Sequence, residues 1–84
     1  MFFQKNEVIQ LTSGKKHLVV DTIKHDEQYY YYVCEVDSHM NRVINSFRVI
    51  TTVNENNCLF VRTVKGELAE ELTEKFRNKL LNRD

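Results

Sequence analysis

The sequence predicts an α+β fold that is mainly β, with a five-stranded antiparallel meander, strongly curled, and one C-terminal amphipathic helix packed on it. Short runs of β-branched and aromatic residues, separated by polar clusters, fill the first 65 residues, and this pattern is typical of strands. Residues 67–81 change to a helical hydrophobic period. Because 84 residues leave room for only one core, we expect a single domain covering residues 1–84.

Turn-forming residues set the boundaries of the predicted strands. Gly14 can adopt the positive φ of a tight hairpin, and residues 54–57, Asn-Glu-Asn-Asn, have the composition of a second turn. Connections of about three to five residues favour antiparallel pairing, because parallel strands need crossovers of a dozen or more. The expected strands span about residues 7–12, 17–24, 29–36, 42–53 and 58–64.

Alternation along the third and fourth strands assigns residues to faces. In the third strand, Glu35 marks the face that we expect to lie nearer solvent, and Tyr29, Tyr31 and Val33 share that face. The opposite face carries Tyr30, Tyr32, Cys34 and Val36. In the fourth strand we expect Val43, Phe47, Val49 and Val53 in the core, opposite Arg42, Ile44, Ser46, Arg48 and Ile50.

Apolar side chains on both faces of most strands favour a strongly curled sheet or a small barrel over a flat sheet with one wet face. Proline, which can mark an edge strand, is absent from the chain. The sequence therefore gives no indication of which strands form the edges.

The C-terminal segment predicts a helix over about residues 67–82. Its large apolar residues recur every four positions and, with Ala69, fall within an arc of about 120°, the width of a core-facing stripe. There is no Ser, Thr or Asp capping box before it, so packing on the sheet must hold the helix in place. Leu81 lies outside the stripe and is expected to be exposed or to contact a second copy of the chain. The stripe consists of Leu68, Leu72, Phe76 and Leu80.

Charge and targeting features exclude several classes of function. Twelve basic and twelve acidic residues balance, which removes the electrostatic footprint of a generic nucleic-acid or membrane binder. The sequence shows no signal-peptide pattern and no run of about 18 apolar residues. We therefore expect a cytoplasmic protein in which Cys34 and Cys58 are reduced thiols.

No motif indicates catalysis or a cofactor. The histidines and cysteines have no C-x-x-C, H-x-x-x-H or H-E-x-x-H spacing, although Cys34, Asp37 and His39 surround one predicted turn. Gly14 and Gly66 are the only glycines, so no glycine-rich loop can cradle a phosphate. We expect no enzyme activity, no metal, no cofactor and no small-molecule substrate.

Four consecutive tyrosines, residues 29–32, suggest one candidate surface. If the face carrying Tyr29 and Tyr31 is exposed, the two rings form an aromatic platform beside Arg42 or Arg48. Such a platform could contact a protein partner, or it could stack nucleobases as single-strand binders do. Alternatively, the rings have only a packing role, because tyrosine favours strands and tolerates partial burial.

Two neighbouring segments near the N-terminus form one pattern: residues 8–14 read Val-Ile-Gln-Leu-Thr-Ser-Gly, and residues 18–21 read Leu-Val-Val-Asp. Together they resemble the opening hairpin of small SH3-like barrels, including short bacterial proteins of unknown function. The resemblance covers about fifteen residues. It implies a barrel of five short antiparallel strands that serves binding. The expected function is thus an interaction module of bacterial or phage type that binds a protein partner or itself, with nucleic-acid binding as the alternative.

Overall fold

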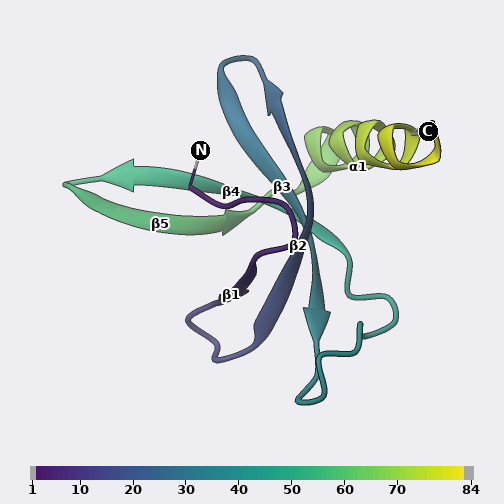
Figure 1. Ribbon diagram of the computed structural model, residues 1–84. Helices are drawn as coiled ribbons and strands as arrows, with labels where there is room; N and C mark the ends of the chain where they lie inside the picture. The colour runs from purple at the N-terminus through teal and green to yellow at the C-terminus, as the bar shows by residue number, and fades with distance from the viewer. Residues whose placement is uncertain (1, 83–84) are drawn as a thin grey trace.

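The computed structural model describes residues 2–82. Each strand pairs antiparallel with its neighbours in the chain, in the order β1-β2-β3-β4-β5, and the helix follows. The sheet curls into a half-barrel with the helix on one side of it (Figure 1). This confirms the predicted fold class. The elements are β1 (Val8–Gln10), β2 (Lys16–His25), β3 (Gln28–Val36), β4 (Arg48–Glu55), β5 (Cys58–Thr63) and α1 (Gly66–Leu81).

The prediction of a long fourth strand from residue 42 is wrong, since β4 begins at Arg48 and residues 37–47 form a connection. The Asp37 carboxylate accepts hydrogen bonds from the backbone N–H groups of His39 and Asn41, both at 2.9 Å, and so closes a local turn. Asn45, inside the predicted strand, has a φ of 63°, which an extended strand does not allow. Hydrogen bonds from the backbone to the Asp37 side chain therefore stabilise a turn where hydrophobic alternation predicted the approach to a strand.

Two clusters of buried residues lie on opposite faces of the sheet. A register shift between Val19 and Asp21 in β2 lets the adjacent Val19 and Val20 both be buried, one in each cluster. The helix-side cluster contains Val20, Tyr30, Tyr32, Cys34, Val49, Leu72 and Phe76. The inner cluster contains Ile9, Val19, Tyr31, Val33 and Ile50.

The prediction that the face carrying Tyr31 lies nearer solvent is wrong. Tyr31 and Val33 are fully buried in the inner cluster, and only Glu35 and Tyr29 on that face keep partial exposure. The curl of the sheet is the cause, because it wraps β1 and the N-terminal Phe3 over this face while α1 covers the other. The tyrosine run thus fills two cores.

The predicted core set of the fourth strand is correct in part. Val49 is buried as expected, whereas Ile50, predicted on the opposite face, is also fully buried. Phe47 remains 42% exposed because it belongs to the connection before β4. Val43 and Val53 are partly buried.

The helix is held by packing, as predicted. Its N-cap residue, Lys65, makes no side-chain capping bond, and Leu72 and Phe76 are fully buried. The Phe76 ring stacks on Tyr32 with centroids 5.1 Å apart. Leu80 is partly buried, whereas Leu68 and Leu81 are exposed, so the stripe is narrower than predicted.

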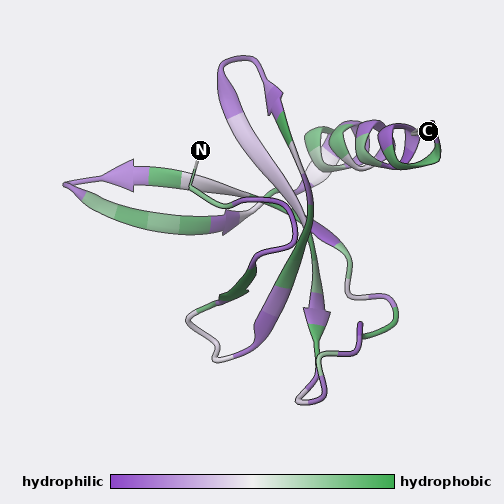
Figure 2. Ribbon diagram, viewed as in Figure 1, coloured by the Kyte–Doolittle hydropathy of each residue, from purple (hydrophilic) through white to green (hydrophobic). Residues whose placement is uncertain are grey.

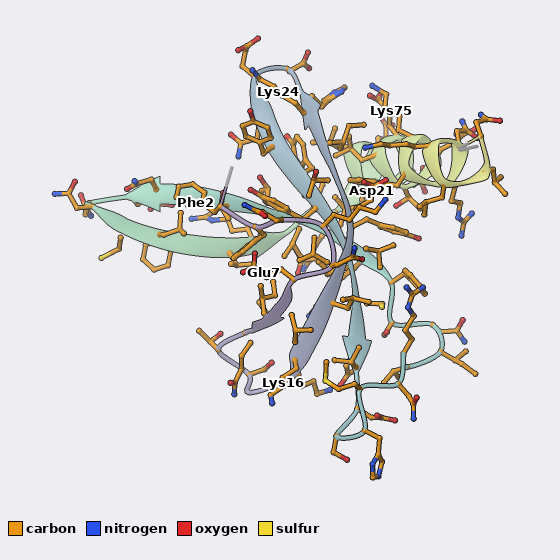
Figure 3. All side chains as sticks on the ribbon, viewed as in Figure 1. Phe2, Glu7, Lys16, Asp21, Lys24 and Lys75 are labelled. Carbon is orange, nitrogen blue, oxygen red and sulfur yellow. The ribbon has the colours of Figure 1, made fainter. Side chains whose placement is uncertain are left out.

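Polar contacts fix the helix against β2. Lys79 Nζ lies 3.2 Å from the buried Asp21 carboxylate and donates to the Thr22 carbonyl at 2.9 Å. Lys75 extends from the side of α1 nearest the β2–β3 hairpin (Figure 3), where its Nζ lies 3.0 Å from His25 Nδ1. These contacts add polar links between α1 and β2 to the packing of Leu72 and Phe76.

Candidate functional site

The β5 strand is an exposed edge of the sheet. Among residues 2–82 it pairs with β4 alone, and all six of its residues are exposed. The β4–β5 hairpin projects from the body of the molecule (Figure 1), and most of β5 is hydrophobic (Figure 2). Leu59, Phe60 and Val61 are exposed by 44%, 48% and 37%, respectively.

Edge strands in proteins are usually protected by charged side chains, proline or a bulge. The β5 strand has no proline, and its one charged residue, Arg62, is engaged by the Glu55 carboxylate of β4. Its pairing with β4 runs without a register shift from Cys58 to Thr63. An apolar, regular and unprotected edge of this kind is typical of a strand that pairs with another chain.

The hairpin turn determines which backbone groups of β5 are free. Asn56 and Asn57 have φ angles of 52° and 64°, as in a two-residue hairpin, whose flanking residues form a hydrogen-bonded pair. The Val64 N–H donates to the Val49 carbonyl at 2.9 Å, which continues the same alternation beyond the strand. The residues whose backbone N–H and C=O point away from β4 are therefore Leu59, Val61 and Thr63.

A groove of about 430 Å³ runs beside this edge, at the open seam of the half-barrel. One wall is the chain that follows β1, and the other is β5. By register, the side chains of Leu59, Val61 and Thr63 share the inner face with Ile50 and Arg48. The lining residues are Gln10, Leu11, Thr12, Ser13, Arg48, Leu59, Phe60, Val61 and Thr63.

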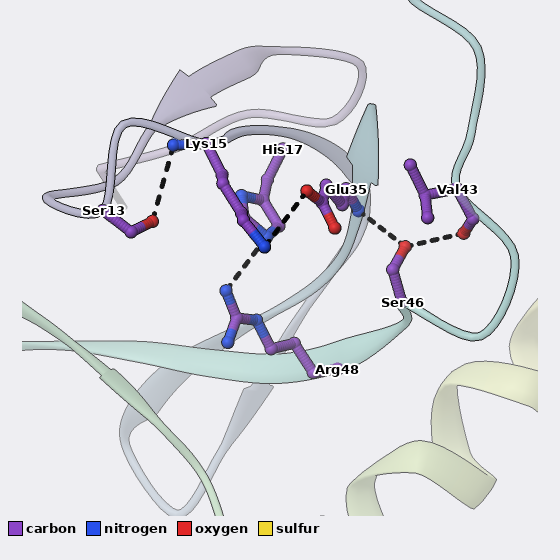
Figure 4. Close-up of polar contacts among 7 residues, drawn as sticks. All are labelled: Ser13, Lys15, His17, Glu35, Val43, Ser46 and Arg48. Carbon is purple, nitrogen blue, oxygen red and sulfur yellow. Dashed lines mark hydrogen bonds and ion pairs between the residues drawn. The ribbon is translucent and has the colours of Figure 1, made fainter. Parts of the chain in front are cut away.

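Arg48 joins this groove to a polar cluster on β2 and β3 (Figure 4). Its Nη2 donates to Nε2 of the buried His17 at 2.9 Å. Beside them, Lys15 Nζ lies 3.6 Å from the Glu35 carboxylate, and the Glu35 N–H donates to Ser46 Oγ. No carboxylate within residues 2–82 forms an ion pair with Arg48, and its Nε is buried without a hydrogen-bond partner there.

His17 is held neutral by its surroundings. Burial lowers the pKa of its imidazole, and the charge of Arg48 lowers it further, while the backbone near Lys15 and the carboxylate of Glu35 act in the opposite direction. Because Arg48 can only donate, Nε2 of His17 must accept, which places the imidazole proton on Nδ1. The neutral His17 thus accepts a hydrogen bond from Arg48 but leaves the positive charge of Arg48 without a counter-ion among the described residues.

The predicted surface of Tyr29, Tyr31, Arg42 and Arg48 does not form. Tyr31 is fully buried, and its hydroxyl accepts a hydrogen bond of 3.1 Å from the Phe2 N–H. Tyr29 is partly buried under Lys24, whose Nζ lies 5.6 Å from its ring centroid. Arg42 lies on the connection and lines a different groove, so only Arg48 reaches the seam.

The predicted site residues did not include Leu59 and Val61 on the β5 edge. A usable signal was present, because residues 58–63 combine apolar side chains at successive positions with a two-residue turn immediately before them. An inner strand would show the same pattern, so the sequence does not separate the two cases.

The residues around the predicted turn do not converge. Cys34 is buried in the helix-side cluster, whereas Asp37 and His39 are exposed. Among residues 2–82 no group of three or more His, Cys, Asp or Glu side chains could hold a metal ion. In the same part of the chain, no helix is both long and apolar enough to cross a membrane.

Comparison of the chain with protein-family models, with curated proteins and with solved structures found no match. A functional assignment must therefore rest on the geometry of the seam and on the chemistry of the residues that line it.

Proposed function

We propose that the chain is a non-catalytic interaction module that binds a segment of another polypeptide chain as an additional strand along β5. The observation that carries the proposal is the exposure of Leu59, Phe60 and Val61 on a regular edge strand whose outward backbone groups have no partner among the described residues. Strand addition of this kind gains affinity from main-chain hydrogen bonds and specificity from alternate side chains.

The energetics favour a partner that also buries side chains. Three outward-facing residues offer about six backbone hydrogen bonds, worth roughly 0.5–1.5 kcal/mol each in net terms. That sum of about 3–9 kcal/mol is comparable to the roughly 4–15 kcal/mol that association costs in lost freedom. Burial of apolar side chains against Leu59, Val61 and the groove must therefore supply most of the remaining affinity.

Nucleic-acid binding is less well supported. The burial of Tyr31 removes one of the two rings that base stacking would use, and Tyr29 is already covered in part by Lys24.

The site of action that we propose is a reducing compartment such as the cytoplasm. Cys34 and Cys58 are both free thiols, and Cys58 is exposed at the start of β5. The hairpin that carries the SH3-like resemblance forms β1 and the first half of β2, and kinship with those proteins is likewise a proposal.

The test replaces Val61 by proline. The Val61→Pro variant loses an N–H that points away from β4, so the β4–β5 hairpin keeps its own hydrogen bonds. Val61→Thr is the matched control because it keeps both the N–H and the β-branched shape. Peptides selected on the wild-type protein from a random nonapeptide display library should bind Val61→Thr with similar affinity and lose at least about tenfold on Val61→Pro.

Sedimentation of the same three proteins tests pairing with a second copy. A dimer that forms in wild type and in Val61→Thr but not in Val61→Pro would also support strand addition at β5. Selected peptides that bind Val61→Pro as tightly as wild type, or that shift only the NMR signals of residues far from β5, would refute the proposal. So would a wild-type protein that selects no peptide and remains a monomer at every concentration.

A further inference from the structure

We propose that the strand docked at β5 carries an acidic side chain, whose carboxylate pairs with Arg48 inside the seam groove. The inference rests on the proposed function and specifies the chemistry of the partner: an extended segment of another protein with an Asp or Glu on the side facing the inner surface of the half-barrel.

The charge of the groove favours an acidic segment. Arg48 is the one charged residue among the described residues that line the seam groove, and the other lining residues are apolar or neutral polar. The nearest ion pair, between Lys15 and Glu35, satisfies its own charges. A segment that fills the groove therefore covers a single cation, and covering it without an anion would carry a desolvation cost.

The guanidinium group of Arg48 does not use all of its hydrogen-bond donors. One of its nitrogens, Nη2, bonds to the neutral His17, which contributes no charge. Its Nε is buried and has no acceptor within residues 2–82. Buried donors in proteins are almost always paired, and a planar carboxylate is the acceptor whose geometry best matches an arginine fork. Nη1 of Arg48 makes no hydrogen bond within residues 2–82, so the guanidinium keeps a donor for a carboxylate beside the bond of Nη2 to His17.

The position of Arg48 relative to β5 sets where the acid lies. Thr63 pairs with Ile50, which is two residues after Arg48 on the same face of β4. A docked residue opposite Thr63 that points to the inner face is thus close to the guanidinium. Because side chains alternate between faces, an acid one position along the docked strand would point away from Arg48.

Pairing through the β5 strand of a second copy does not satisfy the site. That strand carries no acidic residue, and its one charge is Arg62. Pairing of β5 with β5 of another copy would leave Arg48 without a carboxylate. The charge of the groove therefore favours a different polypeptide.

The experiment uses the random nonapeptide display library and three proteins: wild type, Arg48→Gln and Arg42→Gln. Arg42 is the matched control because it is exposed and lines a different groove. Peptides selected on wild type and on Arg42→Gln should be enriched in Asp or Glu at one position, and those selected on Arg48→Gln should lack the enrichment. The best peptide is then remade with the acid changed to its amide, and with the acid moved by one residue.

Both changes in the peptide should weaken binding to wild type by roughly tenfold or more, the usual contribution of a charge-assisted hydrogen bond. These two peptides test the inference even if Arg48→Gln does not fold. Peptides that dock at β5 without acidic enrichment, or that tolerate the amide, would overturn the inference and leave the proposed function intact. The inference would also be overturned, with the proposed function intact, if no peptide is selected and the wild-type protein forms a dimer that Val61→Pro does not form.

Discussion

Truncation of Leu72 to alanine tests the packing of α1 on the sheet. Leu72 is fully buried in the helix-side cluster, together with Phe76 and residues of β3 and β4 that the sheet holds in place. Because those strand residues cannot move in to fill the space, the cost should lie within the range of about 2–5 kcal/mol seen for buried leucines. The total free energy of unfolding expected for a folded unit of 84 residues is only about 4–13 kcal/mol.

A loss of about 3 kcal/mol corresponds to a fall of roughly 12–24 °C in the melting temperature of a folded unit of this size. Circular dichroism during thermal and urea unfolding measures the loss. Leu81→Ala on the same helix is the matched control, because Leu81 is 80% exposed and its truncation should cost less than about 0.5 kcal/mol. If Leu72→Ala melts within a degree or two of wild type, α1 does not complete the core and the described packing is wrong.

Two further predictions concern buried ionisable groups. The pKa of His17 is lowered in the folded protein, so His17 of the unfolded chain binds a proton at its ordinary pKa of about 6.5 while His17 of the folded chain stays neutral. The free energy of unfolding should therefore fall as the pH drops below about 6.5, by at most about 1.4 kcal/mol per pH unit. Urea unfolding from pH 7.5 to 5 should show a shallower dependence for His17→Gln but not for the exposed His39→Gln, and equal slopes would contradict the assignment. Burial raises the pKa of the Cys34 thiol, which should make this cysteine unreactive in the native protein. A thiol reagent should therefore label only Cys58 in the native protein and both cysteines in denaturant. Rapid labelling of Cys34 in the native Cys58→Ser variant would contradict this prediction and show that the core opens.

The elements of the fold were predictable because their signals are local. Residues 56–57 specify a tight turn through their own backbone preferences, and the four-residue spacing around Leu72 specifies a helix whatever surrounds it. The connection at residues 37–47 was missed since Asp37 determines it through side-chain bonds to the backbone, and alternation of hydrophobic residues does not report such bonds.

Exposure was less predictable than secondary structure. A single charged residue, Glu35, marked one face of β3 as wet, yet Tyr31 on that face is fully buried. Glu35 lies near the end of the strand, where it pairs with Lys15 at the rim, while Tyr31 lies four residues inward. In a curled sheet, burial changes along a strand as well as between its faces, so alternation alone could not locate the candidate site.

The same curl explains why the seam beside β5 remains open. Closing the half-barrel would require β1 to pair along β5, but β1 has three residues and β5 has six. Asn6, with a φ of 74°, ends the extended conformation before Val8, and the turn at Gly14 follows soon after Gln10, so β1 cannot lengthen without breaking its own hairpin. Within residues 2–82 no strand covers Leu59 and Val61, and a docked segment of another protein would complete the barrel that β1 is too short to close.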